Sequence, residues 1–238
     1  MKDEEKTKEQ LIEEIKTLQM MIKKLDDELE SERKGLDKAL QQSSEKLQRG
    51  MKDVMLAMAS LVEIRNPLMT GHHERVANLV FAIATEMGLS EEQTTGAFLA
   101  GLVHDIGEIK IPLDILIKPY RVSEEEFTFI KTHPQVGYDL LKTIELPWPV
   151  AEIVLQHHER IDGSGYPKGL KGEAILLEAR ILGIADVVEA MSSFRIYRRS
   201  SGIQRAMEEI TKKKGDLYDT EVVDTCLKIF TEQGFTFD

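Results

Sequence analysis

His104 and Asp105 stand side by side at the end of an apolar helical run, Phe98–Val103. Gly107 and Pro112 follow and are expected to end that helix. Burial of an imidazole and a carboxylate is costly unless hydrogen bonds or a metal ion compensate them. The pair therefore predicts either a hydrogen-bonded feature of the core or part of a metal site, and these two residues alone leave both interpretations open.

Further residues of the same chemical types occur elsewhere in the chain. Five of the six histidines and two acids lie in apolar surroundings near predicted helix ends or within helices: His72, His104, His133, His157, His158, Asp105 and Asp186. Each one alone is more often a satisfied core residue than a ligand. Together they offer only nitrogen and oxygen ligands, and more of them than one tetrahedral zinc ion needs. The set suits two octahedral ions such as iron or manganese that share a carboxylate. Two such ions hold the attacking and leaving oxygens of a phosphoryl group and activate water.

Helices are predicted to position these residues. An amphipathic helix within residues 70–90 begins near His72, and Ser90 with the two glutamates after it predicts the start of the helix that leads to His104. Ser123 is expected to begin a helix that ends near His133. Helical segments are also expected around 137–143, 149–158, 203–213 and 220–233, and a further helix carries Asp186. A turn-rich stretch at 162–172 separates them, and no alternating strand pattern appears. The predicted fold is all-α.

The first fifty residues have a different pattern. Leucine and isoleucine recur at alternating spacings of four and three, at Leu11, Ile15, Leu18, Ile22, Leu25 and Leu29, and resume out of phase at Leu36, Leu40 and Leu47. This is the seam of a coiled coil, interrupted by a stutter. The pattern predicts a coiled-coil dimerisation helix over residues 1–50 and a separate domain over 51–238. The alternative is a solvated amphipathic helix that folds back on the domain.

Composition narrows the class of protein. The formal net charge is −11, which argues against a nucleic acid polymer as partner. No apolar run is long enough to span a membrane. The N-terminus is charged and lacks the apolar core of a signal peptide, and Cys226 is the single cysteine. These features favour a cytoplasmic protein.

At this point the residues resemble a known family. The pattern His72, His104-Asp105 and Asp186 resembles the ligand pattern of HD-domain phosphohydrolases. The additional His133-Pro134, His157-His158-Glu159 and the stretch from Asp162 to Pro167 resemble the HD-GYP subfamily, which hydrolyses cyclic di-GMP. The resemblance covers residues 63–230. It implies an HD-domain helical bundle, which the predicted coiled-coil helix would precede.

The resemblance also implies roles for individual residues. A first metal ion would be held by His72, His104, Asp105 and Asp186, and a second by the bridging Asp105 with His133, His157 and His158. Family members with a third ion carry a glutamate where this chain has Leu68, so two divalent ions, iron or manganese, are expected. Tyr166, Arg195 and Arg198 are expected to bind the substrate. The alternative for these three is loop packing and solvated charge.

One departure from the family pattern bears on catalysis. Where the family usually has lysine after His-Asp-Ile-Gly, this chain has Glu108. A carboxylate there should repel an anionic diester. Three outcomes follow from the sequence: Glu108 joins a metal ion or acts as a general acid, Lys110 reaches in as the missing charge, or the domain binds metal and ligand but hydrolyses slowly.

The resulting hypotheses are of two classes. The first is a phosphodiesterase that opens cyclic di-GMP to linear pGpG, GMP or both, with Asp105 and Glu108 as catalytic residues and Lys110 as a substrate contact. The second is a degenerate signalling module. A phosphodiesterase for another cyclic dinucleotide is a third possibility. The expected partners are a second copy of the chain, bound through the coil, and an upstream sensor or regulatory protein.

Overall fold

A computed structural model describes residues 7–193 and 202–237. Within these ranges the secondary structure is helical and contains no strand. The predicted all-α class is therefore confirmed. None of the helices in the described ranges carries an apolar stretch that could cross a membrane.

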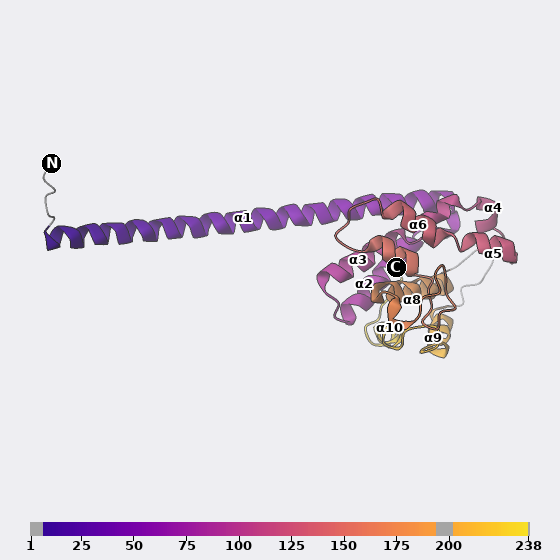
Figure 1. Ribbon diagram of the computed structural model, residues 1–238. Helices are drawn as coiled ribbons and strands as arrows, with labels where there is room; N and C mark the ends of the chain where they lie inside the picture. The colour runs from indigo at the N-terminus through magenta and orange to yellow at the C-terminus, as the bar shows by residue number, and fades with distance from the viewer. Residues whose placement is uncertain (1–6, 194–201, 238) are drawn as a thin grey trace. The chain divides into compact units, whose positions relative to one another are not determined.

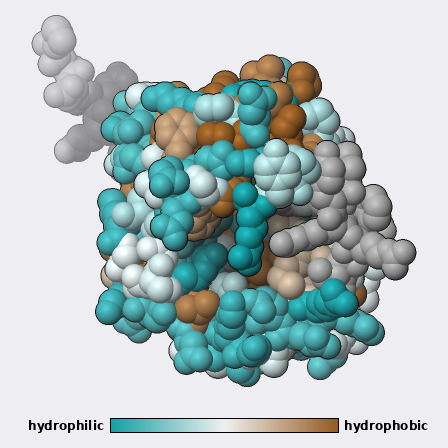
Figure 2. Space-filling model, turned by 90° about the vertical axis from the view of Figure 1, so that its right-hand side faces the viewer, coloured by the Kyte–Doolittle hydropathy of each residue, from teal (hydrophilic) through white to brown (hydrophobic). Residues whose placement is uncertain are grey.

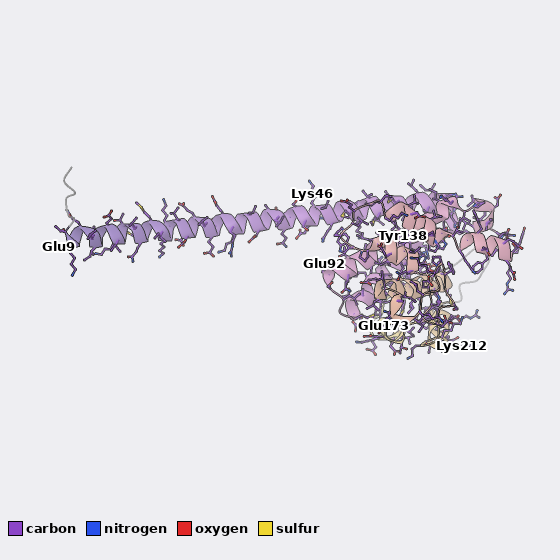
Figure 3. The ribbon with its side chains drawn as sticks, in the orientation of Figure 1. Glu9, Lys46, Glu92, Tyr138, Glu173 and Lys212 are labelled. Atoms are coloured by element: carbon purple, nitrogen blue, oxygen red, sulfur yellow. The ribbon has the colours of Figure 1, made fainter. Side chains whose placement is uncertain are left out.

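The chain divides into two units, residues 1–51 and 52–238. Helix α1 (Lys8–Arg65) provides the described part of the first unit and continues into the second. In the first unit the side chains stand out into solvent along the helix between the labelled Glu9 and Lys46 (Figure 3). The predicted seam is exposed, with Leu18 at 52% and Leu29 at 62% of their full accessibility. An apolar seam this exposed is compatible with a coiled coil, and the pairing itself stays a prediction.

Three helices form the centre of the second unit: α2 (His72–Glu86), α3 (Glu91–Val103) and α8 (Leu177–Ser192). Leu79 and Ile83 of α2, Leu102 of α3 and Ile181 of α8 are fully buried among them. Figure 1 shows α2, α3 and α8 in the body of this unit. Burial of these aliphatic side chains is the main favourable term in folding.

The remaining helices complete the domain. They are α4 (Leu113–Leu116), α5 (Glu124–Ile130), α6 (His133–Leu141), α7 (Val150–Gln156), α9 (Gly202–Lys212) and α10 (Thr220–Glu232), with 3₁₀ turns η1 (Pro67–Met69), η2 (Ile106–Lys110) and η3 (Gly172–Ala174). The predicted caps at Ser90 and Ser123 are present as capping boxes, in which each serine accepts from a backbone N–H and a side chain three residues on accepts in return.

One boundary was predicted wrongly. The helix expected to end near His133 ends at Ile130, and His133 begins the next helix, α6. Pro134 explains the difference, because proline is favoured in the first turn of a helix, where its missing N–H has no partner to lose. His133 thus lies at the start of one helix rather than at the end of another.

Candidate metal centre

Asp105 lies between two groups of histidines. Its Oδ2 atom is 3.2 Å from His104 Nε2 and 3.8 Å from His72 Nε2. Its Oδ1 atom is 3.3 Å from His133 Nε2 and 4.0 Å from His157 Nε2. Each carboxylate oxygen therefore faces its own set of ring nitrogens, which is the arrangement expected of a carboxylate that bridges two ions.

The two groups are completed by the remaining predicted ligands. Asp186 Oδ1 lies 3.5 Å from His72 Nε2 and 3.8 Å from His104 Nε2. His158 joins Asp105, His133 and His157 in a second group whose ligand atoms all lie within 4.8 Å of one another. The structure thus brings together all seven residues singled out from the sequence.

Backbone carbonyls orient three of the rings in the same way. Nδ1 of His104 donates to the carbonyl of Gly101 at 2.8 Å, and His133 and His157 donate to Ile130 and Val154 at 2.9 and 2.6 Å. Each acceptor lies three residues earlier in the chain, at or near a helix end. Because Nδ1 carries the proton, the Nε2 lone pair is directed to the centre, which is how metal-binding histidines are commonly held.

His72 is oriented by a buried carboxylate instead. Its Nδ1 is hydrogen-bonded to Oε2 of Glu189, which is 1% exposed. Arg75 donates to the other oxygen of Glu189 at 2.7 Å, and Ser193 also donates to that oxygen. Burial alone would raise the pKa of Glu189, but the bonds from His72, Ser193 and Arg75 outweigh it and lower the pKa to about 2. Glu189 is therefore ionised and fixes the His72 ring.

The protonation states suit metal binding. Burial lowers the pKa of His157 and His158 well below the usual range, and it lowers that of His133. These rings are neutral and can act as ligands. Burial would also lower the pKa of His104, but the charge of Asp105 outweighs it and raises the pKa to about 10. In the metal-free chain a proton thus sits on His104, and binding of a cation displaces it.

The nitrogen atoms themselves fit a cation. The Nε2 atoms of His72 and His104 are 3.4 Å apart, as are those of His133 and His157. The inward-facing lone pairs of neutral His133 and His157, beside a buried carboxylate, are unfavourable without a positive charge between them. Neutral imidazole and carboxylate suit iron and manganese, and no thiolate is present in either group.

The turn that follows Asp105 is held closely against α6. A Cβ atom on Gly107 would lie 2.0 Å from the carbonyl oxygen of His133. Only glycine therefore permits this approach of η2 to the start of α6. Arg65, at the end of α1, donates to the carbonyls of Glu108 and Ile109 at 2.8 and 2.6 Å and to that of Ile111. These contacts fix the position of the turn relative to the histidines.

The glycine-rich stretch places Tyr166 beside the second group. Its ring lies 4.7 Å from that of His158, tilted by 33°. Glu159 is 5% exposed and accepts the N–H groups of Lys168 and Leu170, so it ties the loop to the end of α7. Burial, followed by the charges of Asp186, Asp105 and Glu108, raises the pKa of Tyr166, which stays protonated.

The other predicted substrate contacts are placed differently. Glu108 lies in η2 and is partly buried, with its charge acting on Tyr166. Lys110 is exposed, and its charge acts on Asp139 rather than on a residue of the metal centre. Arg195 and Arg198 lie outside the described residues.

Sequence reasoning missed several residues of the site. Glu189 follows Asp186 by three positions on α8, a spacing that places both on one helix face and was a usable signal. Lys131 lies with its ammonium 4.6 Å from the ring centre of Phe127 and 5.7 Å from that of Tyr166. The contact with Phe127, four residues earlier, could be expected from the sequence, but the contact with Tyr166 could not, because Tyr166 lies in a loop more than thirty residues away.

In this helical domain, histidines from several helices surround one aspartate. This arrangement is typical of proteins with a histidine–aspartate metal centre. Residues 57–222 match the family model described as HD domain. This is more than half of the chain. The chain belongs to the HD domain family.

Individual relatives and structures agree with this assignment. The chain is 36% identical over 195 residues to the cyclic di-GMP phosphodiesterase response regulator RpfG of Xanthomonas campestris, covering 81% of this chain and 52% of that protein. It is 38% identical over 161 residues to the 3'3'-cGAMP-specific phosphodiesterase 1 of Vibrio cholerae, covering 66% of this chain and 37% of that protein. This chain therefore spans about half, or less, of the length of these relatives.

The fold is also found in a solved structure. A Vibrio cholerae structure described as a cyclic GMP-AMP specific phosphodiesterase superposes with a TM-score of 0.60 at 19% identity, covering 76% of this chain and 49% of that one. This likeness shows the shared fold.

Proposed function

We propose that the chain is a metal-dependent phosphodiesterase that hydrolyses cyclic di-GMP to linear pGpG, GMP or both in bacterial second-messenger signalling. One observation carries the proposal: the two oxygens of Asp105 face two separate groups of histidines. The names of the relatives, cyclic di-GMP phosphodiesterase and 3'3'-cGAMP-specific phosphodiesterase, support a cyclic dinucleotide as substrate.

The geometry of the two groups supports the ligand assignment. His72, His104, Asp186 and Asp105 would hold one divalent ion, and Asp105 with His133, His157 and His158 would hold the other, iron or manganese. When bound, such a pair supplies Lewis acidity and activates water for attack on phosphorus. Glu189 and the carbonyls behind the other rings keep the Nε2 atoms directed inward throughout.

Tyr166 and Lys131 are the residues best placed to meet the substrate. The phenol stays protonated because burial raises its pKa, so it donates a hydrogen bond to a phosphate or base oxygen. The Lys131 ammonium lies near both the Phe127 and the Tyr166 rings and offers a positive charge to the diester. Phe127 is 43% exposed and offers a face on which a base can stack.

The molecular surface agrees with a binding face in this region. Figure 2 shows the face on which α4 and α5 lie, with a hollow near its middle and apolar side chains gathered along one edge. In α5, Phe127 and Phe129 are both exposed. Arg195, Arg198 and Lys110 remain further proposed phosphate contacts.

The test is hydrolysis by the purified chain, loaded with iron or manganese without oxygen. We expect linear dinucleotide from cyclic di-GMP and none from His104→Ala. Activity of the wild type no greater than that of His104→Ala would refute the proposal. A parallel assay with 3'3'-cGAMP and cyclic di-AMP identifies the preferred dinucleotide.

Glu108 favours a second candidate, a signalling module that binds metal and dinucleotide but turns over slowly. Its charge acts on Tyr166, so a carboxylate lies on the side proposed for the substrate. Tight binding of cyclic di-GMP without product would support this candidate, and rapid hydrolysis by the wild type would exclude it. In either case we propose a cytoplasmic homodimer, joined through the coil, that receives its signal from a sensor domain or partner.

A further inference from the structure

His73, next to the proposed ligand His72, is buried beside the centre and has no role in the ligand set described above. It is 1% exposed, and its Nδ1 lies 3.0 Å from Oε1 of Glu63. The other oxygen of Glu63 accepts the N–H of Gly71 at 2.9 Å. Both carboxylate oxygens are thus occupied, and the ring is held in one orientation with its Nδ1 proton on the glutamate side.

The opposite nitrogen of this ring is buried and unsatisfied. Nε2 of His73 has no hydrogen-bond partner among the described residues. Oδ2 of Asp105 lies 4.0 Å from it. Both atoms carry lone pairs and neither has a proton to offer the other, so they repel. A buried acceptor left in this state is unfavourable.

The spacing of these two atoms matches a cation between them. An ion midway along the 4.0 Å line would lie about 2 Å from each, which is the usual length of a bond from a divalent transition metal to nitrogen or oxygen. The ligand atoms of His73, His104 and Asp105 all lie within 4.8 Å of one another. The carboxylate behind the ring completes the glutamate–histidine–metal arrangement found at many metal sites.

We propose that His73 is an additional metal ligand, positioned by Glu63, on the Oδ2 side of Asp105. His104 has one Nε2 lone pair and can bind one ion through it. The group with His73 and the group with His72 and Asp186 both use that nitrogen, so they surround a single ion rather than two. This inference rests on the metal centre proposed above and assigns its first ion three imidazoles and two carboxylates.

The inference has a consequence for the two ions. The first ion would gain a ligand that the second ion lacks, and five protein ligands leave one position of an octahedron open. Removal of the His73 nitrogen should therefore weaken one ion selectively. Loss of the partner that orients a metal-binding histidine typically lowers metal affinity by about 10–100-fold, and loss of the ligand itself should weaken binding at least as much.

The experiment is a titration of the metal-free full chain with Mn²⁺, in which free Mn²⁺ is followed by electron paramagnetic resonance and bound metal by elemental analysis. His73→Phe removes the nitrogen and keeps a ring of similar bulk. Glu63→Gln keeps the cavity volume and removes the charge behind the ring. Glu178→Gln is the matched control, because Glu178 is also a buried glutamate but bonds to Gln93, away from the centre.

We expect two Mn²⁺ per chain for the wild type and for Glu178→Gln. In His73→Phe one of the two should bind at least tenfold more weakly while the other is unchanged, and Glu63→Gln should show the same loss to a smaller degree. Two ions bound with wild-type affinity in both variants would overturn the role of His73 and leave the proposed centre intact. A wild type that binds no Mn²⁺ would overturn the centre as well. If His73→Phe fails to fold, Glu63→Gln decides the result.

Discussion

At the scale of single residues, the centre depends on groups that hold the imidazoles as much as on the imidazoles. Glu189 is the clearest case, because a buried carboxylate accepts from His72 and is itself held by Arg75 and Ser193. Its ionised state is favoured by these three donors. The carboxylate therefore stabilises the ring in the orientation in which Nε2 faces Asp105.

We predict that Glu189→Gln lowers Mn²⁺ affinity by about 10–100-fold, as is usual when the partner of a metal-binding histidine is lost. Glu178→Gln, on the same helix α8, should bind like the wild type. Titration of the three metal-free proteins gives the comparison. Equal affinities in all three would show that Glu189 has only a structural role.

Glu108 is a second case in which one residue decides a property of the site, because its carboxylate places a negative charge where the substrate is proposed to bind. Glu108→Lys changes the local formal charge from −1 to +1, which should favour a dianionic substrate. We expect kcat/KM for cyclic di-GMP to rise about tenfold or more, since each 1.4 kcal/mol of transition-state stabilisation gives a factor of ten. The measurement is steady-state hydrolysis, with Glu108→Gln as the variant that removes the negative charge alone. A fall in activity in both variants would assign Glu108 a catalytic role instead.

At the scale of elements, the site requires the η2 turn to lie directly on α6. Gly107→Ala would place a methyl group on the backbone of His133, so one of the two segments must move. We predict a loss of about 1–3 kcal/mol of unfolding free energy, as for other overpacked positions. Metal affinity should fall as well, because His133 and Asp105 flank the contact. The control is Gly35→Ala in α1, where an added Cβ atom would meet no other atom within 4 Å. Gly88 would not serve as a control, because its φ is positive and an alanine there would strain the backbone. A stable Gly107→Ala protein with unchanged affinity would contradict the prediction.

Cys226 in helix α10 leads to a prediction about the pH dependence of stability and of thiol reactivity. Burial raises the pKa of the Cys226 thiol to about 12, from a usual value of 9. The neutral thiol is thus favoured by folding, and its contribution to stability is complete below pH 9 and declines as the pH rises from 9 towards 12. At pH 8.5 the thiolate fraction should be on the order of a thousandfold lower in the folded chain than in urea. The rates of alkylation by iodoacetamide in the two states measure this ratio, and equal rates would show that the thiol is accessible.

The elements also show what sequence could predict. Helix starts at Ser90 and Ser123 were readable because a cap is a local event, in which one side chain bonds to a backbone three residues away. The seven proposed ligands were readable because histidines and acids are rare in apolar helices. Glu63 and His73 were not, because their partnership joins the end of α1 to the start of α2 and has no helical spacing. The start of α6 at His133 was missed because a proline is compatible both with a helix end and with the first turn of the next helix, and Pro134 lies in the first turn of α6.

At the scale of the whole molecule, the first unit presents an apolar seam that no residue of its own helix covers. Leu18, Ile22 and Leu25 are each more than half exposed. Exposed apolar rows of this length normally mark an interface, and the alternating four-three spacing matches a second helix of the same kind. The expected state of the full chain is therefore a homodimer joined through residues 8–50.

We predict that Leu18→Glu combined with Leu25→Glu converts this dimer to a monomer. Two carboxylates in the seam would face two more on the partner helix, and each would need to be desolvated. The control is Thr17→Glu combined with Lys24→Glu, which adds carboxylates beside the seam and leaves its apolar row intact. Light scattering at micromolar concentration measures the mass of each protein. A wild-type monomer would refute the coiled coil. A dimer that persists in the seam variant would show that the interface lies in residues 52–238 instead.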